Sequence, residues 1–213
     1  MTKMNCVSRK KKRLSAEQRY ERLLKAATGE FLEKGYAATN LDDIISRAGG
    51  SRRSIYTHFG GKEGLFQALV TQVATQILAP VRQEPDKNKN LKESLLCFAN
   101  RLVAALLSPP ALDLSRLALI DGVRFPELAK AYFEAGPGAA ASSLAVLFDL
   151  AMERGEIVHL DSRLAARLFV GMLRDNLYLQ VLLRLREPPE QEEREELVSN
   201  AVEIFLNGIT RQE

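Results

Sequence analysis

The sequence predicts an all-α fold in which a small N-terminal three-helix domain precedes a larger helical domain. Three observations lead to this prediction. Apolar residues recur every three or four positions along most of the chain, without the strict alternation of a half-buried β-strand. Pairs of glycines bracket one very short amphipathic segment within residues 49–61. Prolines and further glycines divide the remainder into segments of helical length.

The first predicted domain covers residues 15–62 and opens with a helix over residues 15–34, which Gly35 ends. The apolar face of this helix consists of Tyr20, Leu23, Leu24, Ala27 and Phe31. A second helix is expected over residues 41–48, with one face made of Leu41, Ile44, Ile45 and Ala48. Thr39 and Asn40 are the candidate caps for it, because their side-chain oxygens can accept backbone N–H groups.

The third helix follows a turn at Gly49-Gly50, where glycine permits positive φ. Ser51 is its expected cap, and Ile55 and Phe59 face inward one turn apart. The outward face carries Arg52, Arg53, Ser54, Tyr56, Thr57 and His58. Two arginines in a first helical turn oppose the helix dipole, at a cost of up to about 1 kcal/mol each. A polyanionic partner explains them better than stability does, and the alternative is an ordinary solvated basic face.

Charge separates along the chain although the net charge is only +3. Residues 1–62 hold 14 Lys and Arg against 6 Asp and Glu, whereas residues 63–213 hold 16 against 21. The excess of positive charge therefore lies where the helix-turn-helix is predicted, as expected for a domain that binds phosphate backbones. Residues 1–14 form a basic arm that we expect to be flexible, and it either contacts DNA or serves only solubility.

The second predicted domain, residues 63–213, contains only helices. The first begins at Lys62 and runs to Pro80, and a polar loop follows over residues 82–90. Further helices are expected over residues 91–107, after Pro109-Pro110 and after Pro126, and the chain is expected to break at Gly136-Pro137-Gly138. The last three helices are expected over residues 139–154, 161–186 and 190–207.

The two final helices are unusually apolar. In the first of them, Leu164, Leu168, Met172, Leu179 and Leu183 share one broad face, while Phe169, Leu173, Leu177 and Val181 occupy others. Because more than one side needs cover, we expect a homodimer in which the last two helices of each protomer form a four-helix interface. Gly171 would permit close approach. The alternative is that all of these residues belong to the core of a monomer.

One stretch resembles the signature of TetR-family transcriptional regulators. The resemblance is carried by Gly35-Tyr36, Thr39, Ile44, Ala48-Gly49, Ser51, Ile55-Tyr56, His58-Phe59, Lys62-Glu63 and Leu65. Residues 124–128 and Gly136-Pro137 are similar to a subgroup linked to efflux control. Two positions depart from the family pattern, since Gly50 replaces a common valine and Gly61 replaces a capping serine or aspartate.

The resemblance implies a homodimeric repressor that binds two half-sites of a palindromic operator on double-stranded DNA and is released by a small-molecule effector. The residues expected to contact DNA are Asn40, Ser51, Arg52, Arg53, Ser54, Tyr56, Thr57, His58 and Lys62. Lys62 would share a phosphate with the free amides of its helix start. As alternatives, Tyr56 could be a half-buried core residue and His58 could cap its own short helix.

The helix that begins at Lys62 is expected to act as a lever between the DNA-reading helix and a ligand cavity in the second domain. Candidate lining residues are Phe98, Leu102, Leu106, Phe125, Tyr132, Phe148, Met152, Phe169, Met172 and Asn176. They indicate an apolar or amphipathic effector, although such residues at helical spacing also form ordinary cores. Asp175-Asn176 either orients the ligand or pairs with Arg174 or Arg124.

Other function classes fit less well. His58 and His159 are the only histidines, and no phosphate-binding glycine loop or nucleophile motif accompanies them, so no catalytic residue, cofactor or metal site is predicted. Cys6 and Cys97 form no disulfide framework, and no run of about 18 uncharged apolar residues exists, which favours a cytoplasmic protein without membrane contact. The remaining alternatives are an activator of the same fold and a helical ligand-binding protein without operator specificity.

Overall fold

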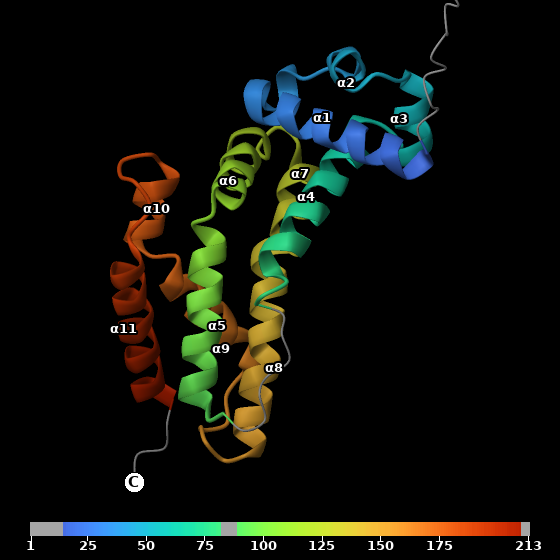
Figure 1. Cartoon of the computed structure of the whole chain (residues 1–213). Coiled ribbons are helices and arrows are strands. Elements are labelled where there is room, and N and C mark those ends of the chain that lie inside the picture. Colours follow the sequence, from blue (N-terminus) through green and yellow to red (C-terminus); the bar gives the residue numbers. More distant parts are fainter. Residues whose placement is uncertain (1–14, 82–88, 210–213) are drawn as a thin grey trace, which may run out of the picture.

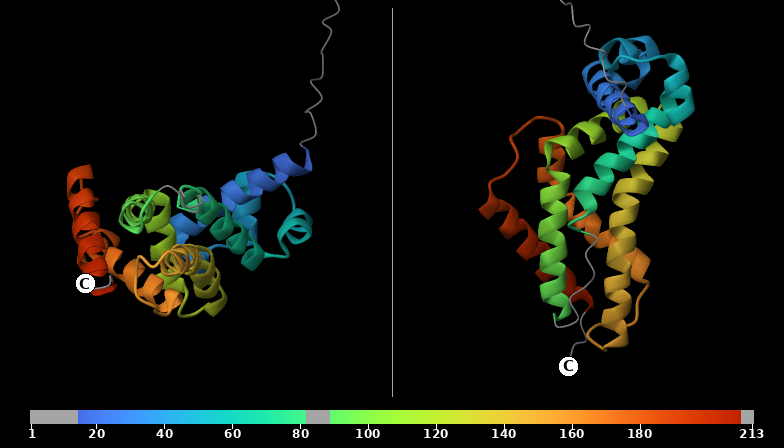
Figure 2. Two further views of the ribbon diagram at one scale, coloured as in Figure 1. Left: turned by 90° about the horizontal axis from the view of Figure 1, so that it is seen from below. Right: turned by 45° about the vertical axis from the view of Figure 1, so that its right-hand side comes forward.

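The computed structural model describes residues 15–81 and 89–209. The predicted basic arm at residues 1–14 and most of the polar loop predicted at residues 82–90 lie outside the described residues. Within them, every regular element is a helix, which confirms the all-α prediction (Figure 1). The first three helices gather at one end of an elongated molecule, and a larger bundle extends away from them (Figures 1 and 2).

The N-terminal helices are α1 (Ala16–Ala38), α2 (Leu41–Ala48) and α3 (Arg52–Phe59). Each begins with a polar cap, because the side chains of Ser15, Asn40 and Ser51 each accept the N–H three residues on. The caps at Asn40 and Ser51 are predicted from the sequence. Thr39 does not cap α2. Its buried hydroxyl instead bonds to carbonyl oxygens of α1 and closes the loop between the two helices.

The end of α1 is kinked at Gly35, where the sequence predicts the helix to stop. Gly35 has φ 81° and ψ 164°, and one further turn continues to Ala38. This conformation is accessible to glycine and strained for other residues. The kink directs the backbone N–H of Tyr36 to α6, where the carboxylate of Asp121 accepts it at 2.6 Å. A buried hydrogen bond thus ties the N-terminal helices to the larger bundle.

The larger part of the chain contains α4 (Lys62–Leu78), α5 (Leu91–Leu106), α6 (Pro109–Asp121), α7 (Pro126–Phe133), α8 (Ala139–Glu153), α9 (Ser162–Leu173), α10 (Asn176–Leu182) and α11 (Gln191–Ile209). Helices α5, α8, α9 and α11 pack against one another as a bundle. Helix α4 leads from the N-terminal helices toward this bundle, with α6 and α7 beside it (Figure 1).

The buried apolar side chains form two clusters, and the division between them lies within α4. Leu65, Phe66, Leu69 and Val70 belong to the cluster that α1–α3 build, whereas Leu78 belongs to the cluster of the bundle. Helix α6 also contributes to both, through Leu114 and Leu117 on one side and Leu112 on the other. A displacement of α4 or α6 in the bundle would therefore change the side-chain packing of α1–α3.

Two helix boundaries differ from those predicted. Gly136-Pro137-Gly138 does not end a helix, because a π-helical turn, η1 (Glu134–Gly138), joins α7 directly to α8. Conversely, the single helix predicted over residues 161–186 is wrong. Helix α9 ends at Leu173, and α10 starts after Asp175, whose carboxylate accepts the N–H groups of Leu177 and Tyr178. This capping interaction stabilises a second helix start inside an otherwise continuous apolar pattern.

One helical stretch of the described residues, Pro126–Glu153, has the length and composition of a membrane span. The bent pair of α5 and α6 meets the same test only when taken together, with a bend of 66°. Within Pro126–Glu153, Leu128, Leu144 and Phe148 are fully buried against the two clusters. These apolar residues therefore pack within the protein.

Candidate DNA-binding surface and ligand cavity

Helix α3 presents a polar face to solvent at the end of the molecule. Ile55 is fully buried and holds the helix against its neighbours, and Gly60 closes it in the left-handed conformation by donating its N–H to the Tyr56 carbonyl. Arg52, Arg53, Tyr56 and Thr57 are exposed, as is Ser51, whose hydroxyl caps the helix. Ser54 is half-buried beside that cap. The outward face predicted from the sequence is therefore present for Arg52, Arg53, Tyr56 and Thr57, whereas Ser54 and His58 are half-buried.

The two arginines of α3 have different surroundings. Arg52 forms a two-pronged ion pair with Asp42 of α2, with its Nε 2.9 Å from the carboxylate. This hydrogen-bonded pair lowers the pKa of Asp42 and raises that of Arg52. Within the described residues, Arg53 is exposed and has no ion-pair or hydrogen-bond partner. Its positive charge is therefore available to an external anion, whereas that of Arg52 is partly neutralised.

Tyr56 and His58 can now be placed. The Tyr56 side chain is 58% exposed, so it is not the half-buried core aromatic considered as its alternative. His58 is half-buried at the base of α3, where its ring contacts Tyr20 edge-on at 6.3 Å and lies next to Phe59. Phe59 in turn stacks on Tyr20 at 4.6 Å. Gly60, rather than His58, caps the helix.

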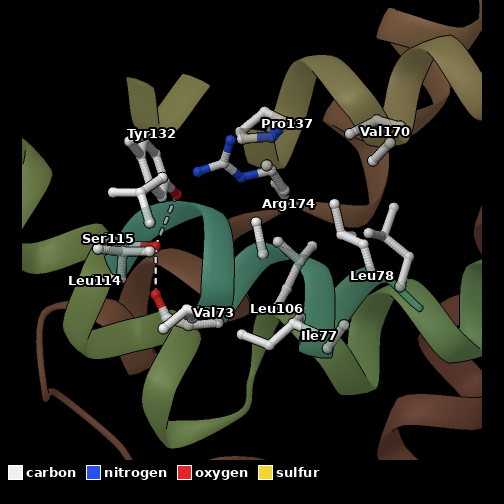
Figure 3. A pocket seen from close by; sticks show the side chains of 17 residues that line it. Val73, Ile77, Leu78, Leu106, Leu114, Ser115, Tyr132, Pro137, Val170 and Arg174 are labelled. Atoms are coloured by element: carbon white, nitrogen blue, oxygen red, sulfur yellow. Dashed lines mark hydrogen bonds between the residues drawn. The ribbon is translucent and has the colours of Figure 1, made fainter. Parts of the chain in front are cut away.

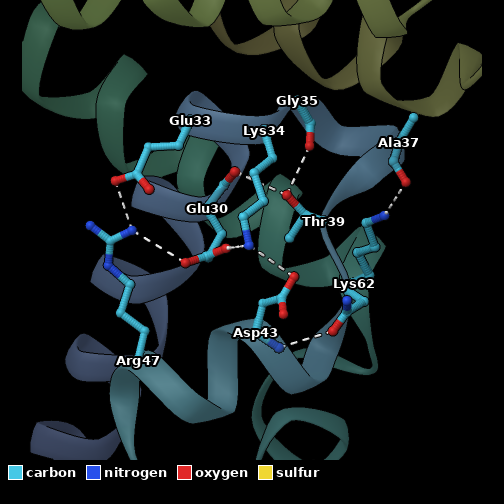
Figure 4. Close-up of polar contacts among 10 residues, drawn as sticks. Glu30, Glu33, Lys34, Gly35, Ala37, Thr39, Asp43, Arg47 and Lys62 are labelled. Carbon is cyan, nitrogen blue, oxygen red and sulfur yellow. Dashed lines mark hydrogen bonds and ion pairs between the residues drawn. The ribbon is translucent and has the colours of Figure 1, made fainter.

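Lys62 lies at the start of α4 but extends back toward α1 (Figure 4). Its ammonium group lies 4.4 Å from the centre of the Tyr36 ring and 3.4 Å from the carbonyl oxygen of Ala37. Burial there lowers the pKa of Lys62. Gly61 provides no side-chain cap, so the first amides of α4 have no such acceptor. Asn40 is likewise engaged, because its exposed side chain caps α2.

A cluster of charges joins α1 to α2 behind this surface (Figure 4). Glu30 is almost fully buried and binds Lys34 at 2.7 Å and Arg47 at 3.2 Å. Lys34 also reaches Asp43, and Arg47 also reaches Glu33. The hydrogen bond from Lys34 contributes most to the lowered pKa of Glu30. The cluster ties α2 to α1, and these two helices support α3.

A cavity of about 50 Å³ lies between α4, α5, α6 and the junction of α7 with α8 (Figure 3). Its walls are almost entirely apolar. They consist of Val70, Val73, Ala74, Ile77, Leu78, Leu102, Ala105, Leu106, Ala111, Leu114, Ser115, Tyr132, Gly136, Pro137, Ala140, Val170 and Arg174. Helix α4 supplies one whole wall, with Val70, Val73, Ala74, Ile77 and Leu78.

One end of the cavity is polar. The hydroxyls of Ser115 and Tyr132 are 2.7 Å apart (Figure 3). The Tyr178 hydroxyl also donates to Ser115, at 3.3 Å. Arg174 donates to the Tyr178 hydroxyl at 3.4 Å and lies 4.9 Å from the centre of the Tyr178 ring. Burial raises the pKa of Tyr132, so its phenol stays protonated near neutral pH.

The predicted lining residues are only partly brought together. Leu102, Leu106 and Tyr132 line the cavity. Phe98, Phe148 and Phe169 are buried in the bundle core, and Met152 and Met172 pack against that core. Phe125 packs on Tyr36 near the N-terminal helices, and Asn176 is exposed at the start of α10. The wall from α4 and the polar residues Ser115 and Arg174 were missed, because small and aliphatic side chains carry no local signal of a cavity.

A second connection leads from the cavity to the N-terminal helices through α6. Ala111, Leu114 and Ser115 line the cavity from this helix, and Asp121 at its end accepts the Tyr36 N–H. Phe125, just beyond α6, packs edge-on against the Tyr36 ring at 4.8 Å. Burial, with a smaller effect of nearby carboxylates, raises the pKa of Tyr36 to about 12. Both α4 and α6 thus join the cavity to the end of the molecule that carries α1–α3.

Two family models match the chain in succession. Residues 23–69 match the model of bacterial regulatory proteins of the TetR family. Residues 93–208 match the C-terminal domain of AefR-like transcriptional repressors. The first match covers α2, α3 and most of α1, and the second covers almost all of the bundle from α5 to α11.

The chain is also similar to individual transcriptional regulators. The HTH-type transcriptional activator FasR of Mycolicibacterium smegmatis is 36% identical over 95 residues, and the match spans only 43% of either chain. The HTH-type transcriptional repressor Rv3405c of Mycobacterium tuberculosis is 28% identical over 184 residues, which is 82% of this chain and 85% of that protein. The structure of the flavonoid-responsive regulator FrrA superposes with a TM-score of 0.83 at 27% identity, covering 92% of this chain and all of that one.

Regulators of this kind bind DNA operators and ligands as dimers, and they are not enzymes. The exposed face of α3 and the apolar cavity are the two features that such a protein needs. Because the matched models together cover both ends of the fold, the chain belongs to the TetR family of transcriptional regulators.

Proposed function

We propose that the protein is a ligand-responsive repressor that binds a palindromic operator as a homodimer and is released by a small apolar or amphipathic molecule. The observation that carries this proposal is the course of α4. The helix begins in contact with α3 and forms one wall of the cavity farther along. A ligand in the cavity therefore acts directly on the helix that supports the DNA-reading face. The cytoplasm, where an operator is accessible, is the proposed compartment.

In this proposal α3 lies in the major groove of DNA. Arg53 and Tyr56 are proposed to reach base edges, because both are exposed and Arg53 has no ionic partner within the described residues. Contacts to phosphates or bases are proposed for Asn40, Ser51, Arg52, Ser54, Thr57, His58 and Lys62. Arg52 would exchange Asp42 for a phosphate, and the cost is small because the pair is exposed to water.

We propose that the ligand releases the protein from DNA by changing the distance between the two recognition helices of the dimer. The two recognition helices of a dimer must match half-sites about 34 to 36 Å apart, or a multiple of that distance. The cavity of about 50 Å³ is far smaller than the roughly 300 Å³ or more of ordinary ligand sites. A ligand must therefore move its walls, and α4 and α6 are two of them. Their movement would change the separation of the recognition helices.

The proposed dimer uses α9, α10 and α11. Phe169, Leu173 and Val181 are buried, so they belong to the core of the protomer. Leu164 and Leu168 on α9, Leu179 on α10 and Leu183 directly after α10 are 43% to 59% exposed, and Ile204 is exposed on α11. A second copy of the chain packed against these helices would remove the exposed side chains from water.

The proposal is tested by the binding of the protein to DNA upstream of its own gene and to a scrambled DNA at rising salt concentration. We expect tight binding to the upstream DNA that remains selective at moderate salt, because base contacts depend on salt less than phosphate contacts do. Equal binding to both DNAs, with a steep fall in salt, would mean a basic surface without operator specificity, and the protein would then be a helical ligand-binding protein.

Activation of transcription is the second candidate function, and the similarity to the activator FasR supports it. The same dimer would then bind beside the polymerase site instead of over it. The position of the bound DNA relative to the promoter distinguishes the two functions.

A further inference from the structure

Arg174 separates the cavity from a larger groove on the outside of the bundle. The groove lies between α8 and α9 and has a volume of about 720 Å³. Three residues, Pro137, Val170 and Arg174, line both spaces. The wall between cavity and groove is therefore one layer of side chains, and the long Arg174 side chain is its most adaptable part.

The charge of Arg174 is not balanced. Within the described residues it forms no ion pair, and its contacts are the hydroxyl and ring of Tyr178. The neighbouring carboxylate of Asp175 is engaged in capping α10. The groove itself is also basic, because Arg163 and Arg167 line it with Arg174 while Asp149 is its one acidic residue. A half-buried guanidinium without an acidic partner attracts an external anion.

The hydrogen bonds at this end of the cavity leave few donors other than Arg174. The Ser115 hydroxyl has one proton, which it donates to the carbonyl of Ala111 at 2.7 Å. Tyr132 must therefore donate to Ser115, and Tyr178 does so as well. Both phenol protons are thus used, whereas Arg174 retains N–H groups. The polar end is suited to an acceptor group, and a negatively charged one gains most from it.

We propose that the effector is an apolar molecule with one carboxylate, which Arg174 binds while the apolar part occupies the cavity. This proposal rests on the proposed repressor function. The carboxylate enters from the basic groove, and Arg174 leaves Tyr178 to pair with it. This movement opens the wall between the two spaces, so the small cavity and the large groove become one site. The apolar part then displaces the wall formed by α4.

The experiment is titration calorimetry of the full-length protein, without DNA, against decanoate and phenylpropanoate and against the matched alcohols and amines. We expect at least one carboxylate to bind more tightly than its alcohol and amine. Arg174→Gln should lower the affinity of that carboxylate on the order of tenfold to a hundredfold, the usual effect of losing a charged hydrogen-bonded partner. Arg174→Lys should retain part of it.

Arg167→Gln is the comparison variant, because Arg167 lines the groove but not the cavity, and it should weaken carboxylate binding far less than Arg174→Gln does. The melting temperatures of the variants show that each is folded. The proposal is overturned if neither carboxylate binds, if the alcohols bind as tightly, or if Arg167→Gln weakens binding as much as Arg174→Gln. Release of operator DNA, measured separately, tests the repressor function alone. If an alcohol releases operator DNA, the repressor function stands and the proposal that the effector carries a carboxylate is refuted.

Discussion

The double variant Arg53→Ala, Tyr56→Ala should lose sequence-selective binding to the operator. Both side chains are exposed on α3, and Arg53 has no ionic partner within the described residues, so the substitutions remove contacts to DNA without opening the core. A bidentate contact to a base is worth about 1 to 3 kcal/mol. Because a dimer carries each substitution twice, operator affinity should fall roughly 30-fold to 10⁴-fold through Arg53 alone.

The matched control is Lys92→Ala, which removes one exposed positive charge on α5, outside the DNA-binding helices. It should leave operator affinity unchanged. The measurement is a fluorescence anisotropy titration of labelled operator and scrambled DNA with each protein. If the double variant remains as selective as the wild type, another surface reads the DNA, and the role proposed for α3 is incorrect.

Replacing Leu164 and Leu168 by glutamate should convert the dimer to a monomer. The two leucines lie one turn apart on α9 and are 43% and 59% exposed in the protomer. Full burial of a leucine contributes about 1.5 to 3 kcal/mol, and a symmetric interface would bury four of them. Four glutamates in their place add repulsion and desolvation, so the dissociation constant should rise by several powers of ten.

Leu32→Glu is the control, because Leu32 is also 43% exposed but lies on α1. The mass in solution, measured by light scattering over a range of concentrations, should remain dimeric in the control. A dimeric Leu164→Glu, Leu168→Glu variant would place the interface elsewhere on the chain.

The helix-turn-helix was predictable because its signals are local. Ser51 and Asn40 cap their helices as the sequence indicates, and Gly49 and Gly60 adopt the positive φ that ends α2 and α3. Apolar spacing alone placed Ile44 and Ile55 in the core. Side-chain pairing across helices is not local, so the ion pair of Arg52 with Asp42 and the contact of Lys62 with Tyr36 were not foreseen.

The second domain was harder to predict because capping and packing between helices override the local sequence signals for where a helix begins or ends. The sequence shows Asp175 as a polar residue within an apolar helix, although an aspartate before a helical run is also a capping signal. At Gly136-Pro137-Gly138 the opposite occurred, since η1 continues the helical path from α7 to α8 through residues that usually end a helix, and η1 packs against α4. The similarity to an efflux-control subgroup stays a prediction, and the matched C-terminal model is that of AefR-like repressors.

The cavity was predicted as a class of site rather than as a set of residues. The sequence favours large aromatic side chains as its lining, but Phe148 and Phe169 are fully buried in the core of the bundle. The space remains where small residues face one another, such as Ala74, Ala111 and Ala140. The packing of the whole bundle decides which small residues meet across helices. The periodicity of apolar residues along one helix carries no information about that packing.

Occupation of the cavity and binding of the operator should exclude each other, and Ala74→Leu tests this without knowledge of the effector. Ala74 is buried on α4 and lines the cavity, so a leucine there fills the space and pushes α4 as a ligand would. Ala151→Leu is the control, because it adds the same bulk at a buried position of α8 outside the cavity.

The measurement is the operator affinity of the two variants at a temperature where both are folded and dimeric. We expect Ala74→Leu to bind operator roughly 5-fold to 150-fold more weakly than the wild type, the usual range of allosteric coupling, while Ala151→Leu binds as the wild type does. Undiminished operator affinity in a folded Ala74→Leu protein, with the leucine seen in the cavity by crystallography, would contradict the proposed coupling of the cavity to α3 through α4.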